Sequence, residues 1–176
     1  MKDTTNSSKT RLNNRYVALT AILASLITIM TAYICHIPVP IAGGYMHLGD
    51  SLIFLAATLL PTPYACAAAA IGGGLADLLT APMWTVPTLI IKALIALPFT
   101  HKNAKILSPR NMIAPLFAYL ISGTGYFLAN SLVFHSSVAF LTSFGASAIQ
   151  SFGSAVVFYI LAVLLDKAGF KQQMNL

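Results

Sequence analysis

The chain has 176 residues, of which 57% are hydrophobic and 8% are charged, and its mean hydropathy is +0.80. A soluble domain carries about 25% charged residues, so the composition excludes a water-soluble globule. Ten Lys and Arg against four Asp give a net charge of +6, a sign that nucleic-acid-binding proteins share. Here, however, the basic residues flank apolar runs that are nearly free of charge, which indicates a polytopic membrane protein.

Six apolar segments follow one another along the chain, separated by prolines, glycine clusters and charges. We predict an all-α membrane domain of six transmembrane helices over residues 16–166, with a basic amino-terminal segment (1–15) and a carboxyl-terminal tail (167–176). The first segment is too long for a signal-peptide core and is expected to be retained. The predicted spans are Tyr16–Ile34, Met46–Leu60, Tyr64–Thr80, Trp84–Phe99, Met112–Phe134 and Phe140–Leu165.

Nine of the ten basic residues fall on one side of the membrane if six helices are counted. The three loops on the other side, residues 36–45, 81–83 and 135–139, contain no Lys or Arg. By the positive-inside rule, both termini are therefore expected in the cytoplasm. The nine residues are Lys2, Lys9, Arg11, Arg15, Lys102, Lys105, Arg110, Lys167 and Lys171.

The second, third and fourth segments are short for helices that cross a bilayer, which need about 20 residues. An alternative is a re-entrant hairpin over Met46–Thr80 with Pro61-Thr62-Pro63 at its tip. Such a hairpin leaves the side of every charge unchanged, but its backbone has to be buried in protein.

Three charged residues lie inside the predicted spans: Asp50, Asp77 and Lys92. A charge near the bilayer centre costs about 2.5–3.5 kcal/mol, so intramembrane charges normally face a partner or a cavity. All three are expected in the outer half of the membrane, with Lys92 about 12 Å below the outer end of its helix. Lys92 is either a structural ion-pair partner of one of the aspartates or a ligand contact in an outward-facing pocket, and the two roles are compatible.

Polar residues recur at helical spacing in the last three spans, so that each of these helices has one hydrogen-bonding face. Such rows also serve helix packing in membranes, and that interpretation stays open for the sixth span. The rows are Trp84, Thr88 and Lys92; Ser122, Tyr126 and Asn130; and Ser143, Ser147, Gln150 and Ser154.

Aromatic residues near this region, Tyr45, Trp84 and Tyr126, can stack on a flat ring or anchor the protein at the interface. His47 also lies near the outer surface, without any spacing typical of metal ligands. The run Gly72–Gly74 lacks the Gly-Lys of a phosphate-binding loop and predicts close helix packing. Because no nucleophile–base pair is present, we predict neither an enzyme nor a bound cofactor or metal.

Several segments together resemble the substrate-binding S components of energy-coupling factor (ECF) transporters, in particular the riboflavin-type S-component family. They begin with Tyr45-Met-His-Leu-Gly-Asp50-Ser-Leu-Ile-Phe-Leu-Ala56, followed by Leu60-Pro-Thr-Pro63, Gly72-Gly-Gly-Leu-Ala-Asp77 and Pro87-Thr-Leu-Ile-Ile-Lys92. The resemblance extends from about Arg15 to Lys167. It implies six helices, an outward-facing pocket for a vitamin-like molecule, and a multi-pass position in the bacterial cytoplasmic membrane.

The resemblance also implies partners: a transmembrane coupling protein and two ABC ATPases that hydrolyse ATP for transport. In such proteins the first helix resembles a docking surface with small residues four apart, often Ala-x-x-x-Ala. The matching region here contains Ala18, Ala21, Ala24 and Ser25, with Ser25 in the place of the second alanine. Serine is small enough to keep a close backbone approach.

The sequence therefore predicts a substrate-capture subunit of an ECF importer, which binds a planar heterocycle from outside. Riboflavin, pyridoxine, a pyrimidine and a queuine- or queuosine-like deazapurine are the ligands that the resemblance suggests. The alternatives are a stand-alone proton- or ion-coupled carrier and a non-transport membrane interaction protein. The predicted binding residues are Lys92, Asp50, Asp77, Trp84, Thr88, Asn130, Gln150, Tyr126, Tyr45 and His47.

Overall fold

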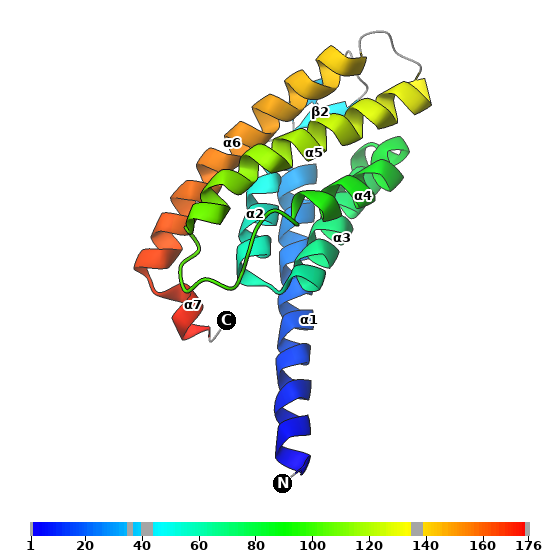
Figure 1. The fold of residues 1–176 in the computed structure, drawn as a ribbon. Helices are drawn as coiled ribbons and strands as arrows, with labels where there is room; N and C mark the ends of the chain where they lie inside the picture. The colour runs from blue at the N-terminus through cyan, green and yellow to red at the C-terminus, as the bar shows by residue number, and fades with distance from the viewer. Residues whose placement is uncertain (1, 35–36, 40–43, 135–138, 175–176) are drawn as a thin grey trace.

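The computed structural model describes residues 2–34, 37–39, 44–134 and 139–174. The predicted all-α class is confirmed except for one short antiparallel strand pair, and both termini lie at the same end of the bundle (Figure 1). The elements are α1 (Lys2–Ala32), β1 (Ile37–Val39), β2 (Gly44–Met46), α2 (Asp50–Leu59), α3 (Thr62–Thr80), the 3-10 turn η1 (Pro82–Trp84), α4 (Thr85–Ile95), α5 (Pro109–Phe134), α6 (Ala139–Lys167) and α7 (Phe170–Gln173).

Three helices in the described ranges are long and apolar enough to cross a membrane: Asn14–Ala32, Pro109–Leu132 and Phe140–Lys167. The shorter α2 has 10 residues, which rise only about 15 Å. That is roughly half of the hydrocarbon core of a bilayer. The six predicted apolar segments therefore become helices of very unequal length.

The outer end of the predicted second span is wrong, because Met46 pairs with Ile37 in the strand pair and α2 begins only at Asp50. Pro38, in β1, has no N–H to donate in a helix, and here it pairs with Tyr45 of the antiparallel strand β2. The predicted fourth span is too long at both ends. Trp84 belongs to the 3-10 turn η1, and α4 ends at Ile95, three residues before Pro98.

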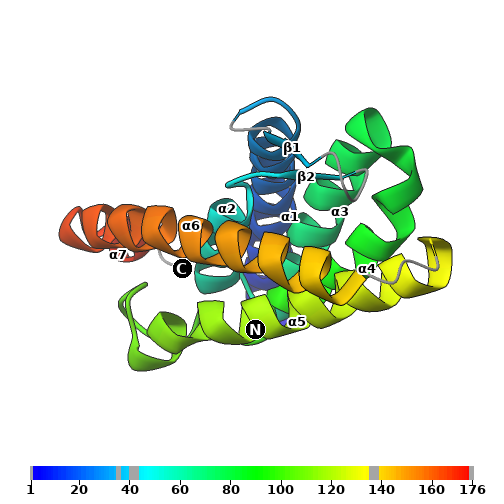
Figure 2. The same cartoon turned by 90° about the horizontal axis from the view of Figure 1, so that it is seen from above.

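The glycine run packs α3 closely against two neighbouring helices, as predicted. A Cβ at Gly72 would lie 2.7 Å from the Cβ of Ile27 and 2.8 Å from the carbonyl oxygen of Ala24, both in α1. At Gly73 it would lie 2.7 Å from the Cγ of Lys92 in α4. The absent side chains therefore let α3 lie between α1 and α4 (Figure 2).

Hydrogen bonds hold the connection between α4 and α5 against the rest of the bundle. The Asp166 carboxylate accepts from the backbone N–H groups of Ile106 and Leu107, at 2.7 and 3.0 Å. Asn111 is fully buried and bonds to both the N–H and the C=O of Thr100. Lys171, in the predicted tail, donates to two carbonyls of the same connection. The connection is therefore a fixed part of the fold.

Candidate substrate-binding site

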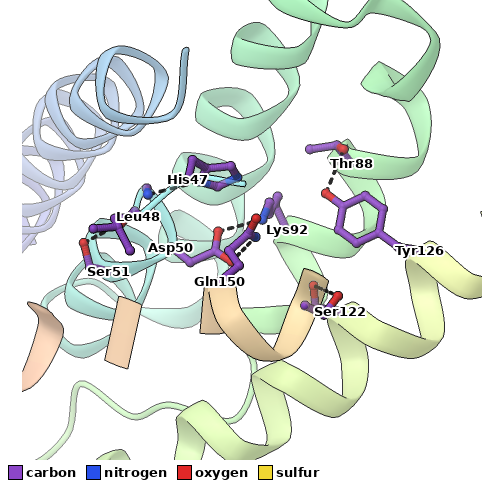
Figure 3. A network of polar contacts seen from close by, with 11 residues as sticks. His47, Leu48, Asp50, Ser51, Thr88, Lys92, Ser122, Tyr126 and Gln150 are labelled. Carbon is purple, nitrogen blue, oxygen red and sulfur yellow. Dashed lines mark hydrogen bonds and ion pairs between the residues drawn. The ribbon is translucent and has the colours of Figure 1, made fainter. Parts of the chain in front are cut away.

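A buried ion pair joins α2 and α4, and a hydrogen bond connects this pair to α6 (Figure 3). Lys92 Nζ of α4 lies 2.6 Å from Asp50 Oδ1 at the first residue of α2, and each side chain is 1% exposed. The other carboxylate oxygen of Asp50 accepts a hydrogen bond of 2.8 Å from Gln150 Nε2 of α6. Two charges removed from water in this way require their partners, because an unpaired buried charge is strongly unfavourable.

Two aromatic rings, Trp84 and Tyr126, lie beside this ion pair. The hydroxyl groups of Tyr126 in α5 and Thr88 in α4 are 3.0 Å apart, at hydrogen-bonding distance. The Trp84 ring meets the Tyr126 ring edge to face, with centroids 5.9 Å apart and an interplanar angle of 70°. Lys92 Nζ lies 5.8 Å from the centroid of Tyr126, at the outer limit of a cation–π contact. The predicted row of Trp84, Thr88 and Lys92 therefore faces one region, as its spacing indicated.

Two further predicted residues lie around the ion pair. His47 is 6% exposed, and its Nδ1 accepts a hydrogen bond of 3.0 Å from the backbone N–H of Gly49, directly before Asp50. Asp77 is 5% exposed and follows Gly73 by four residues, on the helix face that approaches Lys92. Of the two aspartates predicted as partners of Lys92, Asp50 forms the direct ion pair.

The polar residues of α5 and α6 have two roles. Some bond the two helices to each other, and one bonds to the ion pair. Asn130 Nδ2 donates to Ser143 Oγ at 2.8 Å, and the hydroxyl groups of Ser122 and Ser147 are 3.4 Å apart. These contacts join α5 to α6, as the packing interpretation proposed. Among the described residues of α6, Gln150 is the one with a hydrogen bond to the ion pair, whereas Asn130 of α5 bonds to Ser143.

The side chain of Tyr45 lies outside the described part of the structure, although its backbone pairs with Pro38 between β2 and β1.

The small residues of α1 lie on two different faces. Ala18, Ala21 and Ser25 are exposed, whereas Ala24 is 3% exposed and its carbonyl oxygen lies against Gly72 of α3. Ser25 Oγ donates to the carbonyl of Ala21 at 2.9 Å. Because this hydroxyl is bonded within its own helix, the face of Ala18, Ala21 and Ser25 is small and effectively apolar.

The central cluster offers both donors and acceptors to a polar molecule. An ammonium has three N–H donors and a carboxylate accepts about four hydrogen bonds, so Lys92 and Asp50 keep capacity beyond their pair. The adjoining Trp84 and Tyr126 rings supply apolar faces. A small number of convergent polar groups beside aromatic rings is typical of sites for small organic molecules.

Some polar residues of this region are not among the predicted binding residues. Ser51 Oγ donates to the carbonyl of Leu48 at 2.7 Å and helps to start α2. Ser151 and Ser154 of α6 are buried with hydroxyl groups that have no hydrogen-bond partner among the described residues. Serines are common in membrane helices, and only the packing of α6 distinguishes these from the others.

The chain is similar to known protein sequences. The chain is 36% identical over 63 residues to a Pyrococcus woesei protein described as an uncharacterized protein in the gap 3′ region. The matched stretch covers 36% of this chain and 43% of that relative, so it spans less than half of the relative's length. The model of the family described as "ECF-type riboflavin transporter, S component" matches residues 11–167. The chain therefore belongs to the family of ECF-type riboflavin transporter S components, which are substrate-binding transporter subunits and not enzymes.

Proposed function

We propose that this protein captures a planar, polar heterocycle on the outer side of the cytoplasmic membrane and delivers it inward as the S component of an ECF importer. The observation that carries the proposal is the buried cluster of Lys92, Asp50 and Gln150, drawn from three helices beside two aromatic rings. Riboflavin, pyridoxine, a pyrimidine and a queuine-like deazapurine all belong to this chemical class.

The chemistry of the cluster favours a ring that has both carbonyl and N–H groups on its edge. Lys92 can donate to ring carbonyls, and the Asp50 carboxylate can accept from ring N–H groups. The faces of Trp84 and Tyr126 are suited to stacking on the ring. A purely aliphatic ligand would leave the buried charges without additional partners and would gain little from this site.

The distribution of charge supports cytoplasmic termini. The basic residues outside the bundle core gather at the end that carries both termini and the α4–α5 connection (Figure 1). The turn at Leu60 and Pro61, between α2 and α3, lies toward this same end. This supports six passes, in which the short α2 runs toward the cytoplasmic end, over a re-entrant hairpin.

The orientation predicts the accessibility of Thr62, the first residue of α3. A Thr62→Cys variant in a Cys35→Ala/Cys66→Ala background should react with a membrane-impermeant maleimide only in inverted vesicles. Ser137→Cys, in the opposite loop of the sequence, is the matched control and should react only in intact cells. Labelling of both positions from the same side would contradict the six-pass arrangement.

The exposed face of Ala18, Ala21 and Ser25 in α1 is proposed to dock on the transmembrane coupling protein, with two ABC ATPases bound to that protein in turn. Small side chains let two helices approach closely in lipid, where packing and not hydrophobicity drives association. Ala24 packs inside the bundle, so it is not part of this proposed face.

Mass spectrometry of the protein purified in mild detergent should identify a co-purifying heterocycle. The matched variants are Tyr126→Leu, at the site, and Tyr119→Leu, on the same helix, where the ring contacts Phe144 and Phe152. Loss of the stacking ring at Tyr126 should raise the Kd of the identified heterocycle about tenfold. Tyr119→Leu should leave this Kd unchanged. Equal affinities of the two variants would exclude this cluster as the binding site.

Transport assays separate this proposal from its alternatives. Uptake of the identified ligand should require the coupling protein, both ATPases and ATP. Uptake by the chain alone that a proton uncoupler abolishes would indicate a stand-alone carrier. A protein that binds none of the proposed ligands would be assigned to the non-transport class.

A further inference from the structure

An apolar groove with a volume of about 540 Å³ lies between the end of α4 and the first half of α5, away from the proposed substrate site. It is lined by Leu97 and Pro98, which follow the end of α4, and by Arg110, Ile113, Ala114, Phe117 and Ile121 from α5. Ile113 is 56% exposed and Phe117 is 52% exposed. Arg110 is the only charged residue in this lining.

The surroundings of the groove show what medium it faces. Outside the groove lining, α4 and α5 carry further large, apolar and exposed residues, among them Ile90, Leu94, Leu116 and Leu120. In a membrane protein such a surface is in contact with hydrocarbon. The occupant that fits a groove opening on this surface is an acyl chain.

Arg110 places a positive charge at one end of this groove. Its Nε donates to the carbonyl of Pro98 at 2.7 Å and its Nη2 to the carbonyl of Leu97 at 3.4 Å. A guanidinium has five N–H donors in a fixed fork, so three remain for an anionic oxygen. Arginine is suited to phosphate because this fork can bind two oxygens at once.

Neighbouring charges add to this positive potential. Lys102 and Lys105 are exposed on the α4–α5 connection, and Arg110 lies in the first turn of α5, at the positive end of the helix dipole. The carboxylate of this region, Asp166, is bonded to the N–H groups of Ile106 and Leu107. The fixed connection described above therefore holds Arg110 in place without neutralising it.

The groove lining follows α5 from Arg110 to Ile121. From Arg110 to Ile121 the helix rises about 16 Å, and half of a hydrocarbon core is about 15 Å thick. A lipid with its phosphate at Arg110 would therefore lay an acyl chain along Ile113 and Phe117 toward the midplane. In the proposed orientation, Arg110 lies at the level of the cytoplasmic headgroups.

We propose that this groove binds an anionic glycerophospholipid, with its phosphate on Arg110 and one acyl chain between α4 and α5. Basic sites between helices on the cytoplasmic side are where anionic headgroups bind membrane proteins. The apolar lining fits the acyl chain of the lipid. The remaining N–H donors of the Arg110 guanidinium fit its anionic headgroup.

Native mass spectrometry of the full chain in mild detergent tests this directly, without reference to the transported substrate. Phosphatidylglycerol should bind about fivefold more tightly than phosphatidylcholine with the same acyl chains, the effect of about one charge contact. Arg110→Gln should abolish this preference, and Arg110→Lys, which keeps the charge, should retain most of it. Lys167→Gln, which removes a different exposed charge at the same end, should leave it intact.

A large side chain introduced into the groove tests whether the lipid binds there. Ile113→Trp should weaken the binding of both lipids, whereas Leu120→Trp, at an exposed position of α5 outside the groove, should not. Glycerol 1-phosphate, which has no acyl chain, should not compete. Equal binding of the two lipids by the unmodified protein, an unchanged preference in Arg110→Gln, no effect of Ile113→Trp, or competition by glycerol 1-phosphate would each overturn the proposal.

Discussion

Replacing Lys92 by methionine should lower the free energy of unfolding by about 3–5 kcal/mol, the range for breaking a buried ion pair. The Asp50 side chain, 1% exposed, would lose its cation and keep the hydrogen bond from Gln150. In a chain of this size, that loss corresponds to a fall of about 6–20 °C in the unfolding midpoint. Thermal unfolding in mild detergent, followed by circular dichroism, measures it.

The double variant Asp50→Asn/Lys92→Met should be more stable than Lys92→Met alone, because it removes both charges and leaves none unpaired. Lys167→Met is the control for loss of a lysine at an exposed site, where changes stay within about 0.5 kcal/mol. If Lys92→Met were no less stable than Lys167→Met, the ion pair would not stabilise the fold.

The double variant also separates folding from ligand binding. If it folds but no longer retains the co-purifying heterocycle, the charges act on the ligand. If it folds and retains the ligand with unchanged affinity, the pair is structural, and the proposed site loses its charged contacts. The single variants do not allow this distinction because the same substitution affects stability.

Gly72→Ala should destabilise the protein by about 1–3 kcal/mol, the usual effect of adding a methyl group to a well-packed interior. Its Cβ would lie 2.7 Å from the Cβ of Ile27 and 2.8 Å from a backbone oxygen of α1. Neither atom is the flexible end of a side chain, so α1 and α3 have to separate. Thr28 Oγ1, which donates to the Gly72 carbonyl at 3.0 Å, would be displaced as well.

Gly145→Ala is the matched control, because a Cβ at that position of α6 has no neighbouring atom within 4 Å. Alanine there should leave stability unchanged or raise it by up to about 1 kcal/mol through helix propensity. Both variants are compared by the same thermal unfolding measurement. A loss at Gly145 as large as that at Gly72 would show that chain flexibility, and not helix contact, sets the effect.

The sequence predicted the overall plan because it depends on composition and on spacing along single helices. The apolar segments, the gathering of charge at one end and the shared face of Trp84, Thr88 and Lys92 all follow from local pattern. The glycine run also indicated close packing correctly, since no other residue type permits such an approach of two backbones.

Some helix boundaries differ from the prediction, because hydropathy distinguishes neither an apolar strand from an apolar helix nor the point at which an apolar helix ends. Met46 was placed in a span, but it pairs with Ile37 in the hairpin. Similarly, hydropathy extends past Ile95, whereas α4 ends there. In both places proline and tertiary contacts, and not the mean apolar character, decide where the helix stops.

The amino-acid sequence by itself determined that this chain is a helical membrane protein with rare charges inside it. Tertiary structure alone decided that Lys92 contacts Asp50 directly, that Gln150 joins them from a residue 100 positions away, and that Asn130 bonds to Ser143 instead. The physical reason is that periodicity fixes which face of a helix is polar. Which polar faces meet depends on how the helices pack, and that is set by contacts between distant segments.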